Sequence, residues 1–211
     1  MLGANDGIVS TASLIMGVAA AGVGRENIVL AGIAGLTAGA ISMAAGEYVS
    51  VKSQADTEEA DLKMEARELK NYPREELAEL AKIYQERGLD PNLALEVARQ
   101  MTDHDALEAH ARDEIGISTA LSARPLQAAF ASAGMFALGA AIPVLIAMVA
   151  PLSQLLYLTP AVVVLMLGVL GGAAAKAGGA SIARGAIRVC LWGSIAMGLT
   201  ALVGHLFGVK L

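Results

Sequence analysis

The residues best suited to chemistry are carboxylates that recur three positions apart in the middle of the chain. Glu65 and Glu68 form one E-x-x-E pair, and Glu76 and Glu79 form a second. Residues three apart stand on the same face of a helix, so two antiparallel helices can bring these carboxylates together on bound cations. The alternative is a solvated acidic helix face that carries ion pairs between residues four positions apart. Spacing alone favours the solvated face but leaves both interpretations open.

Two residues further along the chain can add ligands to such a site. Glu114 offers a fifth carboxylate, and His110, one helical turn before it, offers an imidazole suited to Fe²⁺ or Mn²⁺. The single cysteine, Cys190, provides no thiolate cluster. Any metal site must therefore use oxygen, imidazole or thioether ligands.

A second set of candidates lies in apolar surroundings. Asp6 and Glu47 are acidic residues inside or at the edge of apolar runs, where an unpaired charge costs roughly 2.5 to 3.5 kcal/mol. Met43 precedes Glu47 by four residues, so a thioether and a carboxylate share one helix face. Each of the two acidic residues therefore needs a structural or functional reason. The alternatives to a functional role are a helix cap for Asp6, an interfacial position for Glu47 and a core position for Met43.

The apolar runs are the elements that must position these residues. The chain is 55% hydrophobic with a mean hydropathy of +0.58, which suits helices packed in lipid. Each run is close to the roughly 20 residues that a helix needs to cross the hydrocarbon core. We therefore predict an all-α membrane protein with five transmembrane helices, at residues 8–23, 28–51, 126–150, 155–175 and 187–209.

An acidic segment separates the second run from the third. Residues 53–125 hold 17 of the 20 acidic and nine of the 15 basic residues, which gives the segment a net charge of −8. This predicts a soluble metal-binding domain inserted between residues 1–52, with transmembrane helices 1 and 2, and residues 126–211, with helices 3 to 5. Helical patterns at 53–70, 75–87 and from 91 to about 116 predict a three-helix insert.

The charges in short loops indicate the orientation of the chain, and missing motifs exclude several classes of function. Lys176, Arg184 and Arg188 lie between the last two runs, and Arg124 ends the insert, so the positive-inside rule places the insert in the cytoplasm. The sequence has no Gly-rich phosphate loop, no Ser/His/Asp constellation and no basic aromatic patch. We therefore expect neither an enzyme, nor an ATP-driven pump, nor a nucleic-acid-binding protein.

Four segments together resemble the vacuolar iron transporter family, which has bacterial members. They are GANDGIVSTASLIMGVAAAG, GLTAGAISMAAGEYVSVKSQADTEEAD, DALEAHARDEIGI and PLQAAFASAGMFALGAAIP. The likeness covers nearly the whole chain. It implies five spans, a homodimer, a cytoplasmic metal-binding domain and export of Fe²⁺, and often Mn²⁺, from the cytosol in exchange for protons.

The resemblance also assigns roles to residues. It places Asp6 and Met43 on the translocation path, with Glu47 nearby. It places five carboxylates at the cytoplasmic metal site: Glu65, Glu68, Glu76, Glu79 and Glu114. His110 departs from the pattern, since plant members carry Met there. Asp6 stands close to the first residue, whereas an Asp at mid-membrane needs roughly ten residues on its cytoplasmic side, so we expect the natural chain to begin further upstream.

We therefore predict a proton-coupled transporter that exports Fe²⁺, Mn²⁺ or both, with Zn²⁺ as a surrogate ion and no covalent cofactor. A carboxylate beside a thioether favours a transition metal over Mg²⁺ or Ca²⁺. We expect a multi-pass protein of a prokaryotic cell membrane, or of the vacuolar membrane if the chain is eukaryotic. The alternative is a membrane-anchored metal sensor or ferroxidase-like iron store that uses only the insert, for which Asp6 and Met43 are dispensable.

Overall fold

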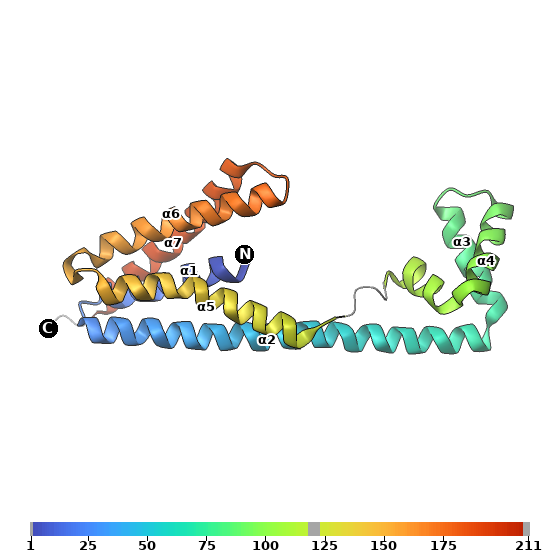
Figure 1. Ribbon diagram of the computed structural model, residues 1–211, viewed down its shortest axis with the longest axis horizontal. Coiled ribbons are helices and arrows are strands. Elements are labelled where there is room, and N and C mark those ends of the chain that lie inside the picture. Colours follow the sequence, from blue (N-terminus) through green and yellow to red (C-terminus); the bar gives the residue numbers. More distant parts are fainter. Residues whose placement is uncertain (1, 118–122, 209–211) are drawn as a thin grey trace. The chain divides into compact units, whose positions relative to one another are not determined.

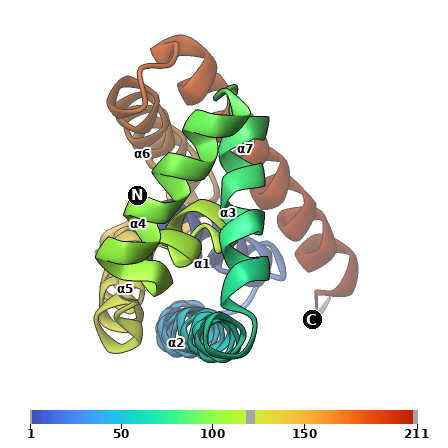
Figure 2. The same cartoon turned by 90° about the vertical axis from the view of Figure 1, so that its right-hand side faces the viewer.

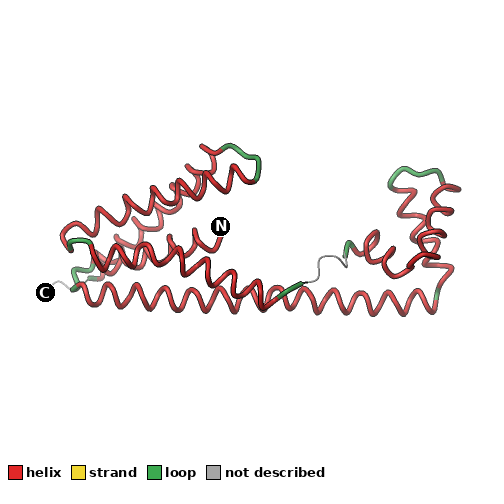
Figure 3. The backbone as a smooth tube through the Cα atoms, in the orientation of Figure 1, coloured by secondary structure: helices red, strands yellow, loops and turns green. Residues whose placement is uncertain are grey.

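The computed structural model describes residues 2–117 and 123–208, and every regular element in them is helical (Figure 3). This confirms the predicted all-α fold class. The main helices are α1 (Leu2–Ala20), α2 (Arg25–Asn71), α3 (Pro73–Glu86), α4 (Pro91–His110), α5 (Pro125–Val149), α6 (Leu155–Ala177) and α7 (Ile182–Phe207). A π-helical turn, η1 (Ala111–Ile115), follows α4, and a 3-10 turn, η3 (Leu152–Gln154), precedes α6.

Four helices in the described residues are long and apolar enough to cross a membrane: α2, α5, α6 together with η3, and α7. They contain all or most of four of the five apolar runs, and the end of the last run, residue 209, lies outside the described residues. The first run, 8–23, falls largely in α1, which is 19 residues long and is not among the four. Asn5 and Asp6 lie inside α1 and reduce its hydropathy.

The chain divides into two compact units. The first consists of Met1–Tyr48 and Leu126–Leu211 and is called here the membrane unit. The second, Val49–Pro125, holds 17 of the 20 acidic residues and is called the acidic unit. The apolar run at 28–51 and the predicted helix at 53–70 are one continuous helix, α2, which contributes residues to both units.

In the membrane unit, α1 packs along α6 and α7 (Figure 1). Their shared core contains Ile8, Ala12, Met16, Val163, Leu167 and Met197. Glycines let the backbones approach, since a Cβ at Gly204 would overlap the carbonyl of Gly17, and one at Gly7 would overlap the carbonyl oxygen of Phe136 in α5. Because one face of α1 is buried against other helices, the polar side chains Thr11 and Ser13 on α1 are shielded from lipid, which would penalise them.

Arg25 fixes the start of α2 to the end of α5. Its guanidinium donates to the carbonyl oxygens of Ala147 at 3.0 Å, Met148 at 2.8 Å and Ala150 at 2.5 Å. The last carbonyls of a helix have no partner within the helix, and they carry the negative end of its dipole. A single cation therefore satisfies three of them.

In the acidic unit, α3 and α4 form an antiparallel pair that faces the viewer in Figure 2. Their core contains Leu80, Ala81, Tyr84, Ala94, Ala98 and Ala109. The prediction of one unbroken helix from 91 to about 116 is wrong at two places. Asp105 has non-helical backbone angles (φ −160°, ψ 99°), and its Oδ1 accepts from the Glu108 amide at 2.9 Å, as an N-cap does. The second place is the π-helical turn η1.

Candidate metal centre and membrane cavity

Four side chains of the acidic unit converge on one point. Glu65 comes from α2, Glu76 from α3, His110 from the end of α4 and Glu114 from η1. Each offers one ligand atom, and these atoms lie within 4.8 Å of one another. Two carboxylates and an imidazole of this metal centre are buried, while Glu114 is exposed and opens one side to solvent.

One ring nitrogen of His110 faces all three carboxylates. Its Nδ1 lies 2.8 Å from Glu114 Oε2, 3.0 Å from Glu65 Oε1 and 3.9 Å from Glu76 Oε2. Although Glu65 Oε1 lies close to this nitrogen, the contact lacks hydrogen-bond geometry, and the oxygen is buried without a hydrogen-bond partner among the described residues. Buried polar atoms without a partner are costly, and a divalent cation bound among the carboxylates would supply a partner for this oxygen.

Crowding of carboxylates makes the charged forms of this centre unfavourable. Burial, and then the nearby charge of Glu114, raise the pKa of Glu65 to about 7. Glu65 lies beyond the apolar run of α2, so it belongs to the part of the helix outside the membrane. Burial also raises the pKa of Glu76, an effect that the charge of His110 opposes. The metal-free centre therefore takes up protons near neutral pH, and a cation and protons compete for it.

A second set of contacts fixes η1, and thereby Glu114, against α3. The hydroxyl of Tyr84 donates to Asp113 Oδ2 at 2.9 Å, and Arg87 donates to Asp113 Oδ1 at 2.5 Å and to its carbonyl oxygen at 2.8 Å. Burial works against ionisation of Asp113, but the hydrogen bonds from Arg112, Arg87 and Tyr84 outweigh it and lower its pKa to about 2. Asp113 therefore stays charged and anchors the residue beside Glu114.

The remaining predicted carboxylates lie outside the four-residue cluster. Glu68 is half-buried one turn beyond Glu65, and Glu79 is exposed one turn beyond Glu76. The charge of Glu68 raises the pKa of both Glu65 and Glu76. The E-x-x-E pairs therefore each place one glutamate in the centre and one at its edge.

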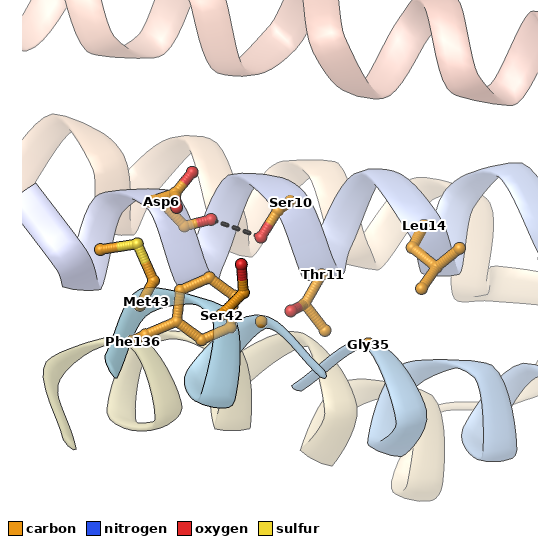
Figure 4. A pocket seen from close by; sticks show the side chains of 9 residues that line it. Asp6, Ser10, Thr11, Leu14, Gly35, Ser42, Met43 and Phe136 are labelled. Atoms are coloured by element: carbon orange, nitrogen blue, oxygen red, sulfur yellow. Dashed lines mark hydrogen bonds between the residues drawn. The ribbon is translucent and has the colours of Figure 1, made fainter. Parts of the chain in front are cut away.

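The membrane unit contains a cavity of about 270 Å³ between α1 and α2, with Phe136 of α5 at one wall (Figure 4). Asp6 and Met43 both line this cavity, whereas Glu47, one turn further along α2, does not. Asp6 is exposed and Met43 half-buried, so the cavity opens at the surface of the single chain.

Hydroxyl groups add oxygen donors to this membrane cavity. Ser10, Thr11 and Ser42 line it beside Asp6 and Met43 (Figure 4). Thr11 is buried, and its Oγ1 has no hydrogen-bond partner among the described residues. No basic residue lines the cavity. A carboxylate, a thioether and hydroxyls form a donor set that suits a divalent transition metal.

Glycines of α2 provide the space for this cavity. A Cβ at Gly39 would overlap the ring of Phe136, and one at Gly35 would lie 2.6 Å from the Leu14 side chain. The hydroxyl of Ser10 could have been predicted, because Ser10 stands four residues after Asp6 and shares its face of the helix; Thr11, five residues after Asp6, points elsewhere and carried no such signal. The anchor at Asp113 was missed as well, because it depends on contacts between residues distant in sequence.

Comparisons with known proteins cover nearly the whole chain. Residues 1–205 match the VIT family. The chain is 44% identical over 207 residues to the vacuolar iron transporter of Acanthamoeba castellanii, covering 98% of this chain and 76% of that protein. It is 36% identical over 210 residues to vacuolar iron transporter homolog 1 of Oryza sativa subsp. japonica, covering 99% and 72%. With homolog 2 of Arabidopsis thaliana the identity is 34% over 214 residues, covering 99% and 84%. The similarity therefore spans both units.

Proposed function

Because the chain belongs to the VIT family, we propose that it is a membrane transporter that exports Fe²⁺, Mn²⁺ or both from the cytosol in exchange for protons. The observation that carries this proposal is the membrane cavity, where Asp6 and Met43 lie together with the unpartnered hydroxyl of Thr11. Relatives named vacuolar iron transporters support metal as the cargo.

The acidic unit captures the ion before transport. Glu65, Glu76, Glu114 and His110 supply carboxylate and imidazole ligands, which suit Fe²⁺ and Mn²⁺ and also accept Zn²⁺ as a surrogate. Glu68 and Glu79 at the edge of the centre add negative potential that attracts cations. Because protons compete for the same carboxylates, capture is stronger at the higher pH of a neutral cytosol than in an acidic compartment.

The membrane cavity moves the ion across. Asp6 and Met43 replace part of the water shell of the ion, and Thr11 adds a hydroxyl oxygen. Protonation of Asp6, or of Glu47 one turn beyond Met43, removes the charge that holds the ion and releases it on the far side. This exchange couples the metal gradient to the proton gradient.

The proposed assembly is a homodimer of five-span chains with the acidic unit in the cytoplasm. In it α1 is the fifth span, shielded from lipid by its neighbours. The face of α2 turned away from the membrane cavity is exposed and apolar, with Leu30, Ile33 and Ile41 uncovered. A second copy packed there would cover these side chains. The membrane is that of a prokaryotic cell, or the vacuole in a eukaryote.

One observation favours a second candidate function. The metal centre lies wholly within the acidic unit, so a membrane-anchored metal sensor or a ferroxidase-like iron store could use it without the membrane cavity. In that case substitutions at Asp6 and Met43 leave function unchanged.

Metal flux into proteoliposomes, measured with and without a pH gradient, distinguishes the transporter from the sensor or iron store. We expect Asp6→Asn to abolish flux, because it removes both the charge that offsets the dehydrated ion and the group that exchanges a proton. Glu26→Gln is the matched control, since Glu26 is an exposed carboxylate at the start of α2 that does not line the cavity. Normal flux in Asp6→Asn, with insertion and oligomeric state unchanged, would refute the transport path.

A further inference from the structure

A cavity of about 490 Å³ lies where α6 ends and α7 begins, and Asn5 of α1 forms part of its wall. Two arginines one helical turn apart on α7, Arg184 and Arg188, line it. The rest of the wall is mainly backbone and small side chains, including Gly171 and Ala175. This arginine cavity is separate from the membrane cavity and from the metal centre, and shares no residue with either.

The positive charge of the arginine cavity has no counter-charge nearby. Neither Arg184 nor Arg188 forms an ion pair or side-chain hydrogen bond within the part of the chain that the structure describes. Residues 126–211 contain no Asp or Glu, and no carboxylate lines the cavity. Lys176, in the last turn of α6, adds a third positive charge to the same end of the helix pair. Both arginines are exposed, so an anion from outside the chain can reach them.

Close packing of α6 and α7 gives the cavity a fixed floor. A Cβ at Gly171 would lie 2.9 Å from the carbonyl oxygen of Gly185, so the two backbones are in contact there. Asn5 lines the cavity with a carboxamide. The donors that the cavity offers are therefore the two guanidinium forks of the arginines, which suit the oxygens of a tetrahedral oxyanion.

The position in the fold indicates which oxyanion is available. Both arginines lie in the first two turns of a helix apolar enough to cross a membrane, and such helix ends lie at the level of the lipid headgroups. Basic pockets between transmembrane helices on the cytoplasmic side bind headgroup phosphates. The volume falls in the range of small-ligand sites, about 300 to 1,000 Å³, which leaves room for a glycerophosphate group. We propose that the arginine cavity binds a phosphate group, carried by an anionic phospholipid or present as free phosphate.

Trp192 provides a built-in reporter. It is the single tryptophan of the chain, stands one turn after Arg188 on α7, and is 66% exposed. The full-length protein is reconstituted in phosphatidylcholine with brominated phosphatidylglycerol, and quenching of Trp192 is compared with that by brominated phosphatidylcholine. We expect a preference for phosphatidylglycerol on the order of ten-fold, from two basic residues at the membrane surface.

Arginine variants and added free phosphate distinguish binding of a phospholipid from binding of free phosphate and from no binding at the arginine cavity. Arg184→Gln with Arg188→Gln should abolish the preference, whereas Arg74→Gln with Arg99→Gln, which removes two exposed charges from the acidic unit, should retain it. A change of Trp192 emission with inorganic phosphate in pure phosphatidylcholine, lost in the first double variant, would support the proposal with free phosphate as the source. Equal quenching by both lipids in the wild type, with no response to phosphate, overturns it without reference to any variant. A preference unchanged in the first double variant also overturns it.

Discussion

Replacing Glu65 by Gln should stabilise the metal-free acidic unit at alkaline pH and remove most of its response to metal. Burial and the charge of Glu114 raise the pKa of Glu65 from its ordinary value of 4.5 to about 7. Each pKa unit corresponds to about 1.4 kcal/mol, so ionised Glu65 lowers the free energy of unfolding by about 3 kcal/mol. Gln keeps the shape of the side chain without the charge.

The pH at which this cost is felt follows from the two pKa values. Glu65 loses its proton near pH 4.5 in the unfolded chain and near pH 7 in the folded chain. Between these values the unfolded chain binds fewer protons, so wild-type stability falls as pH rises from about 4.5 to 7 and stays low above that. Glu65→Gln lacks this contribution, so its stability should match the wild type near pH 5 and exceed it at pH 8.

Hydrogen exchange of peptides from α3 and α4 in the full-length, chelator-treated protein measures this local stability. After correction for intrinsic exchange, Glu65→Gln should exchange up to roughly a hundred-fold more slowly than the wild type at pH 8. Added Mn²⁺ should protect the wild type, by about 2.7 kcal/mol at a hundred times the dissociation constant, and should protect the variant little. Glu75→Gln, an exposed neighbour of Glu76, is the control and should behave as the wild type.

Two results would refute this reasoning. If metal-free wild-type protein kept its stability from pH 5 to pH 8, burial would not be destabilising the ionised carboxylates. If Glu65→Gln kept the full response to Mn²⁺, Glu65 would not be a ligand.

Three further predictions concern other parts of the structure. Met43→Ala should reduce flux of Fe²⁺ more than flux of Mn²⁺ in proteoliposomes, because the softer ion gains more from sulfur; an equal reduction would contradict a ligand role. Arg25→Gln should lower the free energy of unfolding of the detergent-solubilised protein by about 2 to 3 kcal/mol, since three carbonyls of α5 lose a charged donor; an unchanged thermal melt would contradict this. Asp113→Asn should weaken Mn²⁺ binding, measured by calorimetry, because it loosens the anchor beside Glu114, while Glu108→Gln, an exposed control, should not.

The sequence identified the elements better than it identified their ends. The apolar runs and the acidic segment are each contiguous and long, so composition alone separates them. The break at Asp105 was missed because one Asp in a helical pattern is common on exposed faces. The hydrogen bond from the Glu108 amide to the Asp105 side chain could nevertheless have been predicted, because Asp105 and Glu108 have the D-x-x-E spacing of a capping box.

Spacing could predict the glutamate pairs but not which member of each pair enters the metal centre. Residues three apart on an α-helix differ by about 60° in direction, so the rotation of the helix about its axis decides which of Glu65 and Glu68 points more directly at the centre. The choice depends on the packing of α3 on α4, which sequence periodicity does not determine. The same holds for Thr11, whose burial depends on the position of α2.

The π-helical turn η1 has a consequence for how the metal centre tolerates change in chain length. A π turn is an α-helical turn that carries one extra residue, and one residue corresponds to about 100° of rotation in an α-helix. Deleting one residue between His110 and Glu114 would therefore place them three positions apart instead of four and rotate Glu114 about the helix axis relative to His110. The geometry of the centre thus depends on chain length as well as on the identity of its ligands, and a shortened chain would keep all four ligand types in a changed arrangement.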